Sequence, residues 1–240
     1  MAQPFGLKGF LCLCVVASLC SQTEPSQGSA RVPERTGKLE EIVVMLRKLW
    51  GAEFDSNYRK YMLGAMPIVN LIPRAEMIRV ANARLDGRPR DGQDTQGLTI
   101  NRERIVVVYD DIAPLFVAKA INHEIGHLEL RIAGLSPNDE EARIRKVVDT
   151  KFFAEIFGQQ WLESTIAAVE EKVLPVERDG RVYKGHTPQA VAALYERLER
   201  GGVKVERNTV HTRILETVVF ILTNTEERLS AALDSDDTRE

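Results

Sequence analysis

The feature that most restricts the fold is the pentapeptide His-Glu-Ile-Gly-His at residues 123–127, inside a run at 112–133 whose pattern predicts a helix. Side chains four residues apart lie on one face of a helix, so His123 and His127 can bind a single metal ion. Glu124 then lies beside that ion, where it can act as a general base. The pattern therefore predicts a helix that carries two zinc ligands and a catalytic carboxylate.

The residues around the pentapeptide favour a structural unit over a chance match. Residues 104–109 are mostly β-branched and predict a strand, and Asp110 and Asp111 are candidate helix caps. Pro114 suits the first turn of the helix that follows. Strand, short turn and motif helix are thus predicted in direct succession.

The motif helix is apolar on both sides. The stripe that faces away from the histidines consists of Val117, Ile121, Ile125, Leu128 and Ile132, and the histidine face carries Phe116, Ala120 and Leu130. A helix that is apolar all round is buried, and buried histidines need polar partners. The alternative to a metal is a pair of core histidines that bond to the backbone.

Length and composition favour one domain, or one domain with a helical annex. The 240 residues are 44% hydrophobic and 28% charged, close to globular averages. The formal net charge is −3, and no basic stripe is interleaved with aromatic residues. These features argue against a nucleic-acid partner.

Residues 1–20 are typical of a secretory signal peptide. Lys8 precedes an apolar segment that is too short to span a bilayer comfortably. We therefore expect an exported protein, periplasmic or extracellular, whose mature chain has no transmembrane span. Two alternatives stay open, an uncleaved membrane anchor and a lipoprotein modified at Cys20, although the residues before Cys20 resemble a lipobox poorly.

All the cysteines of the chain, Cys12, Cys14 and Cys20, lie in this first segment. Cleavage would leave a mature chain without thiols, which suits an oxidising compartment. A metal ion would then depend on histidine and carboxylate ligands.

The rest of the chain predicts a mostly helical α+β domain at 37–233, between a flexible linker at 21–36 and a disordered acidic tail at 234–240. A strand at 75–81, a charged loop at 84–96 and a hairpin of 98–100 with 104–109 predict a small sheet before the motif helix. The predicted helices are 38–50, a run from about 136 to 173, 187–201 and 209–233. The C-terminal half is therefore expected to be helical.

On these residues the chain resembles the HExxH zincins, the clan that includes the thermolysin-like gluzincin peptidases. The resemblance covers residues 104–133, and its specific part is His123, Glu124 and His127. Leu130 and Ala133 stand where the metzincin pattern requires Gly and His, so the resemblance is to gluzincins. It implies a zincin-like fold, Zn2+ as cofactor, and a protein or peptide substrate whose backbone binds an edge strand before the motif helix.

In gluzincins the third zinc ligand is a glutamate from a following helix. The candidates are Glu140, Glu141, Glu155 and Glu163, with Asp149 as a weaker one. We favour Glu155, because helical phase places it within an apolar cluster, where a lone carboxylate needs a compensating charge. Glu141 is preferred if one unbroken helix carries Glu155 past the histidines. Glu163 lies in a segment similar to the WLxEGxA segment of aminopeptidase-like gluzincins, with its glutamate one position early.

Three protein ligands leave zinc an open position for water, whose pKa falls toward about 7. Glu124 would take a proton from that water and pass it to the leaving amine. The candidate donors to the oxyanion are Tyr183, His186 and His211. A second interpretation is a catalytically weak or inactive zincin-fold protein that binds a partner in the cell envelope.

Overall fold

A computed structural model of the chain describes residues 32–84, 95–101, 104–130, 137–178 and 180–236. These residues form a mostly helical α+β fold with a small mixed sheet and a separate hairpin, which confirms the predicted fold class. The expected signal peptide lies outside the described residues. Within the described ranges, no helix has both the length and the apolar character that a membrane crossing requires.

The three-stranded sheet is built around β3 (Arg104–Val108), a strand of β-branched residues. The last four residues of β3 are fully buried, as expected of a strand that is covered on both faces. β1 (Val69–Ile72) pairs with β3 in parallel, and β2 (Gly97–Asn101) pairs with it antiparallel on the other side. The predicted hairpin is thus confirmed as β2 and β3, whereas β1 is not among the predicted strands.

The prediction of a strand at 75–81 is wrong, because these residues belong to helix α4 (Arg74–Arg84). Its β-branched residues favour a strand locally. Its buried residues, however, are Met77 and Ala81, which are four apart, the spacing of one helix face. Tertiary packing therefore outweighs the local preference.

α5 (Pro114–Glu129) carries the motif and begins with Pro114 in its first turn, as the sequence predicts. The two aspartates before it do not cap the helix, because both bind Arg74. The main-chain N–H of Arg74 donates to Asp110 Oδ1 at 2.9 Å, and its guanidinium donates to both carboxylate oxygens of Asp111 at 2.9 and 3.0 Å. This bidentate pair ties the start of α4 to the turn between β3 and α5.

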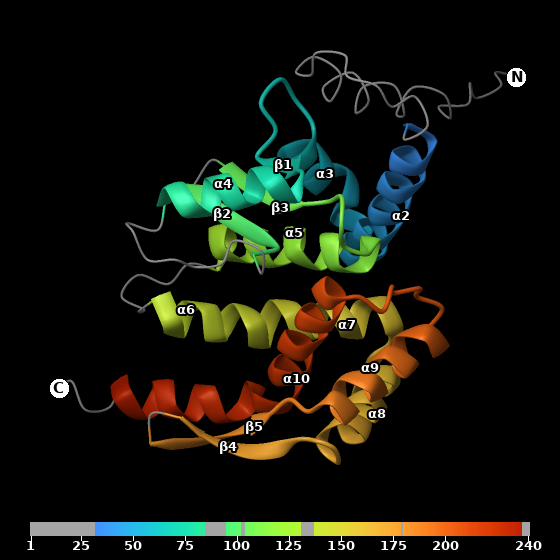
Figure 1. Cartoon of the computed structure of the whole chain (residues 1–240). Coiled ribbons are helices and arrows are strands. Elements are labelled where there is room, and N and C mark those ends of the chain that lie inside the picture. The colour runs from blue at the N-terminus through green and yellow to red at the C-terminus, as the bar shows by residue number, and fades with distance from the viewer. Residues whose placement is uncertain (1–31, 85–94, 102–103, 131–136, 179, 237–240) are drawn as a thin grey trace, which may run out of the picture.

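The N-terminal helices pack beside the sheet and α5 (Figure 1). They are α2 (Val32–Trp50) and α3 (Phe54–Met62), joined by a 3-10 turn at Gly51–Glu53. The first turn of α2 therefore lies within the segment that the sequence predicts as a linker.

The residues after the motif helix form further helices and a hairpin. In chain order these are α6 (Pro137–Ile144), a π turn (Arg145–Asp149), α7 (Thr150–Phe157), α8 (Gln159–Glu170), β4 (Leu174–Arg178), β5 (Arg181–Gly185), α9 (Pro188–Arg200) and α10 (Thr209–Asp236). The single predicted run to 173 is broken at Gly158, whose φ of 94° separates α7 from α8. The hairpin β4–β5 lies between two predicted helices, where the sequence predicts no strand, and α10 continues into the predicted acidic tail.

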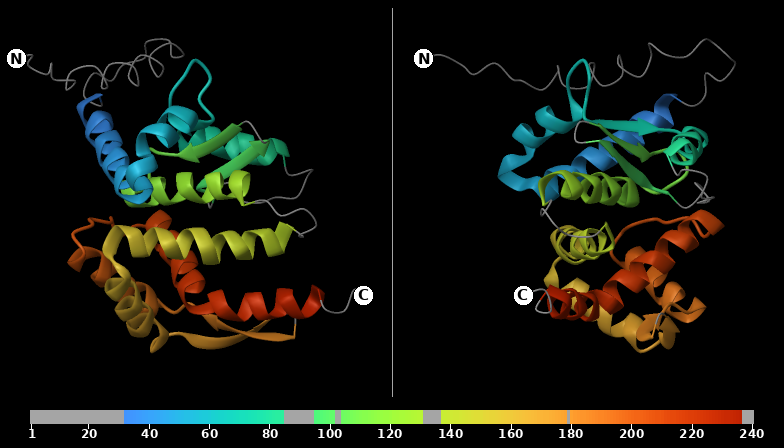
Figure 2. Two further views of the ribbon diagram at one scale, coloured as in Figure 1. Left: turned by 180° about the vertical axis from the view of Figure 1, so that it is seen from behind. Right: turned by 90° about the vertical axis from the view of Figure 1, so that its left-hand side faces the viewer.

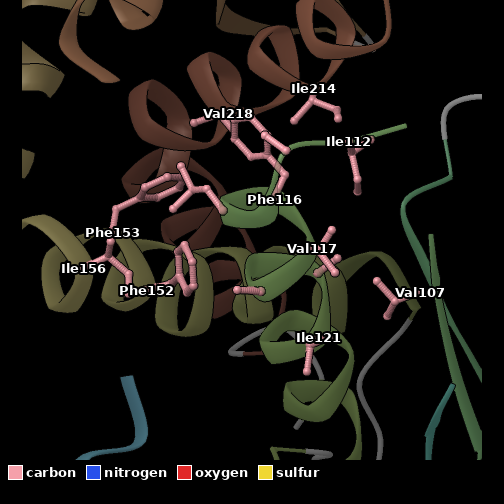
Figure 3. Packing of buried hydrophobic residues seen from close by; sticks show 14 of the residues in the cluster. Val107, Ile112, Phe116, Val117, Ile121, Phe152, Phe153, Ile156, Ile214 and Val218 are labelled. Carbon is pink, nitrogen blue, oxygen red and sulfur yellow. The ribbon is translucent and has the colours of Figure 1, made fainter. Parts of the chain in front are cut away.

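The motif helix occupies the centre of the molecule. α5 lies between the sheet on one side and α6 and α7 on the other, with the C-terminal part of α10 and then the hairpin beyond them (Figures 1 and 2). Apolar side chains from α5, α7 and α10 meet around it (Figure 3). The fully buried or nearly buried residues of this contact include Phe116, Val117, Phe152, Phe153, Ile214 and Val218. This packing fixes α5 against the helices that follow it.

His211 of α10 anchors the start of the motif helix. Its Nε2 accepts a hydrogen bond from the main-chain N–H of Ala113 at 2.9 Å, so its Nδ1 carries the proton and donates to Asn208 Oδ1 at 2.9 Å. Burial lowers the pKa of His211 below 6.5, although Glu206 and Asp111 act in the opposite direction. The neutral ring is thus part of the fold.

A depressed histidine pKa predicts a loss of stability in acid. The unfolded chain binds a proton near the ordinary pKa of 6.5 and the folded chain only at lower pH, so stability is present above 6.5 and falls below it. We expect the free energy of unfolding in urea to fall more steeply from pH 7.5 to about 5 in the wild type than in His211→Gln. Equal slopes in the two proteins would contradict this assignment.

Candidate metal centre

Two ring nitrogens of α5 and one carboxylate oxygen of α6 converge on a single point. His123 Nε2 and His127 Nε2 are 3.2 Å apart, and Glu141 Oε2 lies 3.3 Å from the first and 3.2 Å from the second. These residues form a group that could hold a metal ion. Their side chains are 12%, 20% and 30% exposed, so the site is neither sealed in the core nor open on the surface.

A carboxylate fixes each imidazole from behind. His123 Nδ1 lies 3.1 Å from Asp149 Oδ1, and His127 Nδ1 lies 3.1 Å from Glu140 Oε1. Because a carboxylate accepts hydrogen bonds, each Nδ1 carries a proton and each Nε2 of a neutral ring presents a lone pair. Two lone pairs and the Glu141 oxygen then face one another. Such an arrangement requires a cation, either protons or a metal ion.

The distances fit a tetrahedral metal site. Zinc bonds of about 2.0–2.2 Å place neighbouring ligand atoms roughly 3.3–3.6 Å apart. The observed separations are 3.2 and 3.3 Å. Two histidines and a carboxylate, with a second carboxylate behind each histidine, are also a donor set that zinc binds in proteins. The residues present therefore fit the metal that the motif implies.

The charges around the two rings favour a cation at this point. Burial alone would lower the pKa of His123, but the charge of Asp149 and hydrogen bonds to Asp149 and Glu141 raise it to about 9. Burial would also lower the pKa of His127, but its hydrogen bonds to Glu141 and Glu140 raise it. Both imidazole rings therefore hold a proton more tightly than an ordinary histidine in the metal-free chain.

Arg145 orients the Glu141 carboxylate. Its Nε donates to Glu141 Oε1 at 2.5 Å, which leaves Oε2 facing the histidines. Burial would raise the pKa of Glu141, but hydrogen bonds from His123 and His127 and the charge of Arg145 hold it well below 4.5. Glu141 is therefore ionised, as a metal ligand must be.

Asp149 is completely buried and bridges two basic groups. Its Oδ2 lies 2.8 Å from Lys119 Nζ, and its Oδ1 faces His123. Burial would raise the pKa of Asp149, but the charges of Lys119 and His123 lower it. This ion pair connects α5 to the end of the π turn.

The π turn brings Glu141 and Asp149 to one face of the helix. In a regular α-helix, their separation of eight positions leaves a rotation of about 80°. The extra residue of a π turn sets the phase back by roughly 100°, so that Asp149 comes within about 20° of Glu141. Arg145–Asp149 is that turn. The π turn therefore allows the helical run from α6 to α7 to supply both the candidate ligand Glu141 and Asp149, which supports the candidate ligand His123.

Glu124 lies against the edge strand β2. The hydroxyl of Thr99 donates to Glu124 Oε2 at 2.7 Å, and Glu124 is only 7% exposed. At Gly97, a Cβ atom would lie 2.7 Å from Glu124 Cγ, closer than real Cβ contacts allow. The candidate general base is thus held between the motif helix and β2.

The structure brings Glu141, and not Glu155, to His123 and His127. Glu155 is exposed on α7 instead of lying in an apolar cluster, because the π turn and the break at Gly158 change the helical phase. Along a nearly continuous helix it also lies about 20 Å beyond Glu141. The other candidates have different partners: Glu140 and Asp149 support the histidines, and the exposed Glu163 accepts a hydrogen bond from Gln159 at 2.9 Å.

The three candidate oxyanion donors have contacts elsewhere. His211 bonds to Ala113 and Asn208 as described above. Tyr183 of β5 packs against Phe220 with ring centroids 6.0 Å apart, and the exposed His186 Nε2 lies 3.8 Å from Glu216 Oε1. The hairpin that carries Tyr183 lies beyond α10, on the side away from α5 (Figures 1 and 2).

Sequence reasoning missed Lys119, Arg145 and Thr99. A signal exists for two of them. Lys119 is four residues before His123 in a helix predicted to be buried, where a lysine needs a paired carboxylate. Arg145 follows Glu141 at the i,i+4 spacing of a helical ion pair. Thr99 carries no comparable signal, because its contact joins a strand to a helix.

Comparison of the chain with models of protein families, with curated proteins and with solved structures finds no match. The resemblance to the zincins therefore stays confined to the motif and its immediate surroundings.

Proposed function

We propose that this chain is an exported zinc metallopeptidase, with His123, His127 and Glu141 as zinc ligands and Glu124 as general base. The observation that carries the proposal is the convergence, at 3.2 and 3.3 Å, of one carboxylate oxygen of α6 with two imidazole nitrogens of α5, the helix that holds Glu124. The resemblance of residues 104–133 to HExxH zincins supports the same function.

Each side chain has a distinct role in this proposal. When bound, zinc supplies Lewis-acid chemistry, since it lowers the pKa of water toward about 7 and polarises a carbonyl. Glu124 takes a proton from the attacking water and gives it to the leaving amine. Asp149 and Glu140 keep each Nε2 free by holding the protons on Nδ1, and Arg145 directs Glu141 toward the site.

The free edge of β2 supports a peptide as substrate. The N–H of Val108 donates to the Gln96 carbonyl at 2.9 Å. Hydrogen-bonded residues alternate along an antiparallel pair, so Leu98 also bonds to β3 in the observed register. The backbone groups of Gly97 and Thr99 therefore point away from β3. β2 has no second partner strand among the described residues. A peptide that pairs with this edge would pass close to Glu124, because Gly97 and Thr99 both lie against the Glu124 side chain.

The proposal includes export and a protein or peptide partner. Export to the periplasm or the extracellular space is supported by the composition of residues 1–20, which is typical of a signal peptide. A nucleic-acid substrate is disfavoured by the net charge of −3.

The test is zinc-dependent cleavage of an unfolded protein. We expect the purified chain to bind about one zinc ion. Cleavage should stop when a chelator removes the metal and return when zinc is restored. His127→Ala should lose the metal, whereas His186→Ala, an exposed histidine paired with Glu216, should keep it and serve as the matched control.

The outcomes separate the two interpretations of the sequence. A chain that holds zinc but cleaves no unfolded protein would refute the peptidase and leave a zinc-binding protein. A chain that binds no zinc would refute both.

A further inference from the structure

Two residues of β2 enclose the side chain of Glu124 from the side opposite its own helix. Thr99 holds one carboxylate oxygen, because its hydroxyl donates to Glu124 Oε2 at 2.7 Å and lies 3.3 Å from the Glu124 carbonyl. Gly97 leaves room for the other oxygen, since a Cβ there would come within 2.8 Å of Oε1. The two carboxylate oxygens of Glu124 therefore differ: Oε2 accepts a hydrogen bond from Thr99, and Oε1 lies beside Gly97, which has no side chain.

We propose that Thr99 is a positioning residue, which holds Oε2 of Glu124 so that Oε1 is the atom that exchanges protons with water and the leaving amine. This inference rests on the proposed peptidase function. A carboxylate with one oxygen fixed has a defined rotation about its last bond, and its second oxygen keeps a lone pair in a defined direction. Thr99 itself takes no part in the proton transfer.

The place of Thr99 on β2 connects this role to substrate binding. Its backbone groups point to the edge of the strand that has no partner strand among the described residues, where a peptide would pair, while its hydroxyl holds Glu124. One residue would thus align the peptide backbone and the general base relative to each other. Gly97 lies two residues earlier on the strand and therefore has the same orientation, so both residues contact the same side of Glu124.

Thr99→Val tests the proposal, because it removes the hydroxyl and keeps the shape of the side chain. We expect kcat to fall about 10- to 100-fold, because Glu124 loses a hydrogen bond to its charged group and its carboxylate is no longer held in the reactive position. KM and zinc content should stay near wild type, whereas the melting temperature should fall by a few degrees, because a buried carboxylate oxygen loses its donor. Thr99→Ser, which keeps the hydroxyl, should restore most of kcat. Thr217→Val on the exposed face of α10 is the matched control and should not change kcat.

A second variant and a structural readout complete the test. Gly97→Ala should also lower kcat, because its Cβ displaces Glu124. Crystal structures of the zinc-loaded wild type and Thr99→Val should show one Glu124 rotamer in the wild type and a moved carboxylate in the variant. Wild-type kcat in Thr99→Val, or an unmoved Glu124, would overturn the proposal. If the wild type cleaves no peptide yet Glu124 moves in Thr99→Val, the peptidase function fails while Thr99 still positions Glu124.

Discussion

Glu124→Gln is expected to lower kcat for an unfolded protein substrate by about 10²–10⁴-fold, the usual contribution of a general acid–base group. Glutamine keeps the length of the side chain and can still accept the hydrogen bond from Thr99, but it cannot take a proton from water. The zinc content should stay near that of the wild type, because Glu124 is not among the three converging ligands. The effect should therefore fall on kcat and not on metal binding.

The matched control is Glu129→Gln, the same chemical change on the same helix. Glu129 is half exposed and binds Lys60 and Tyr61 of α3, so the variant should keep wild-type kcat. Steady-state kinetics and metal analysis of both purified variants measure the difference. Unchanged kcat in Glu124→Gln would rule out a general-base role for this residue.

Asp149→Asn should cost about 3–5 kcal/mol of unfolding free energy, the usual effect of breaking a buried ion pair. Asp149 is fully buried, so the variant leaves the Lys119 charge next to His123 without its counter-ion. The measurement is the urea midpoint of the metal-free protein. In the zinc-loaded protein the same variant should weaken metal binding about 10- to 100-fold, because the acceptor behind His123 loses its negative charge.

Lys119→Met in the Asp149→Asn background separates charge from shape. Removing the lysine removes the uncompensated charge, so the double variant should recover much of the lost stability. Its zinc affinity should stay weak, since the charged acceptor for His123 is still missing. Equal stability of Asp149→Asn and the wild type would show that the ion pair does not support the fold.

The elements that surround the motif were predictable because their signals are local. The β-branched run of β3, Pro114 at the helix start and two histidines four apart each depend on a few neighbouring residues. Glu124 follows from the same spacing. The sequence therefore predicts the two histidines of the metal centre and their helix without reference to the rest of the chain.

The identity of the third converging residue depends on helix geometry that the sequence does not display. Glu155 falls among apolar residues only if the chain rotates as a regular α-helix through residues 140–169. The π turn at Arg145–Asp149 and the break at Gly158 both interrupt that rotation. Glu141 lies on α6 before both interruptions, so neither of them changes its position on that helix. A single extra residue per turn is enough to move a carboxylate to another face.

The strand β1 and the helix α4 show a second limit, since local signals in the sequence identify neither element. β1 has four residues and gains its stability from a parallel partner more than thirty positions away. α4 contains β-branched residues, yet Met77 and Ala81 fix it as a helix by packing into the core. Contacts that are distant in sequence decide both elements.

The most direct test of the metal centre is the zinc affinity of Glu141→Gln beside that of Glu155→Gln, measured by competition with a chelating dye. We expect Glu141→Gln to lower the affinity by more than about 100-fold, beyond the effect of losing a supporting residue, because a ligand atom itself is lost. Glu155→Gln, exposed on α7, should bind zinc as the wild type does. Wild-type affinity in Glu141→Gln, or lost zinc in Glu155→Gln, would contradict the assignment of His123, His127 and Glu141 as the metal centre.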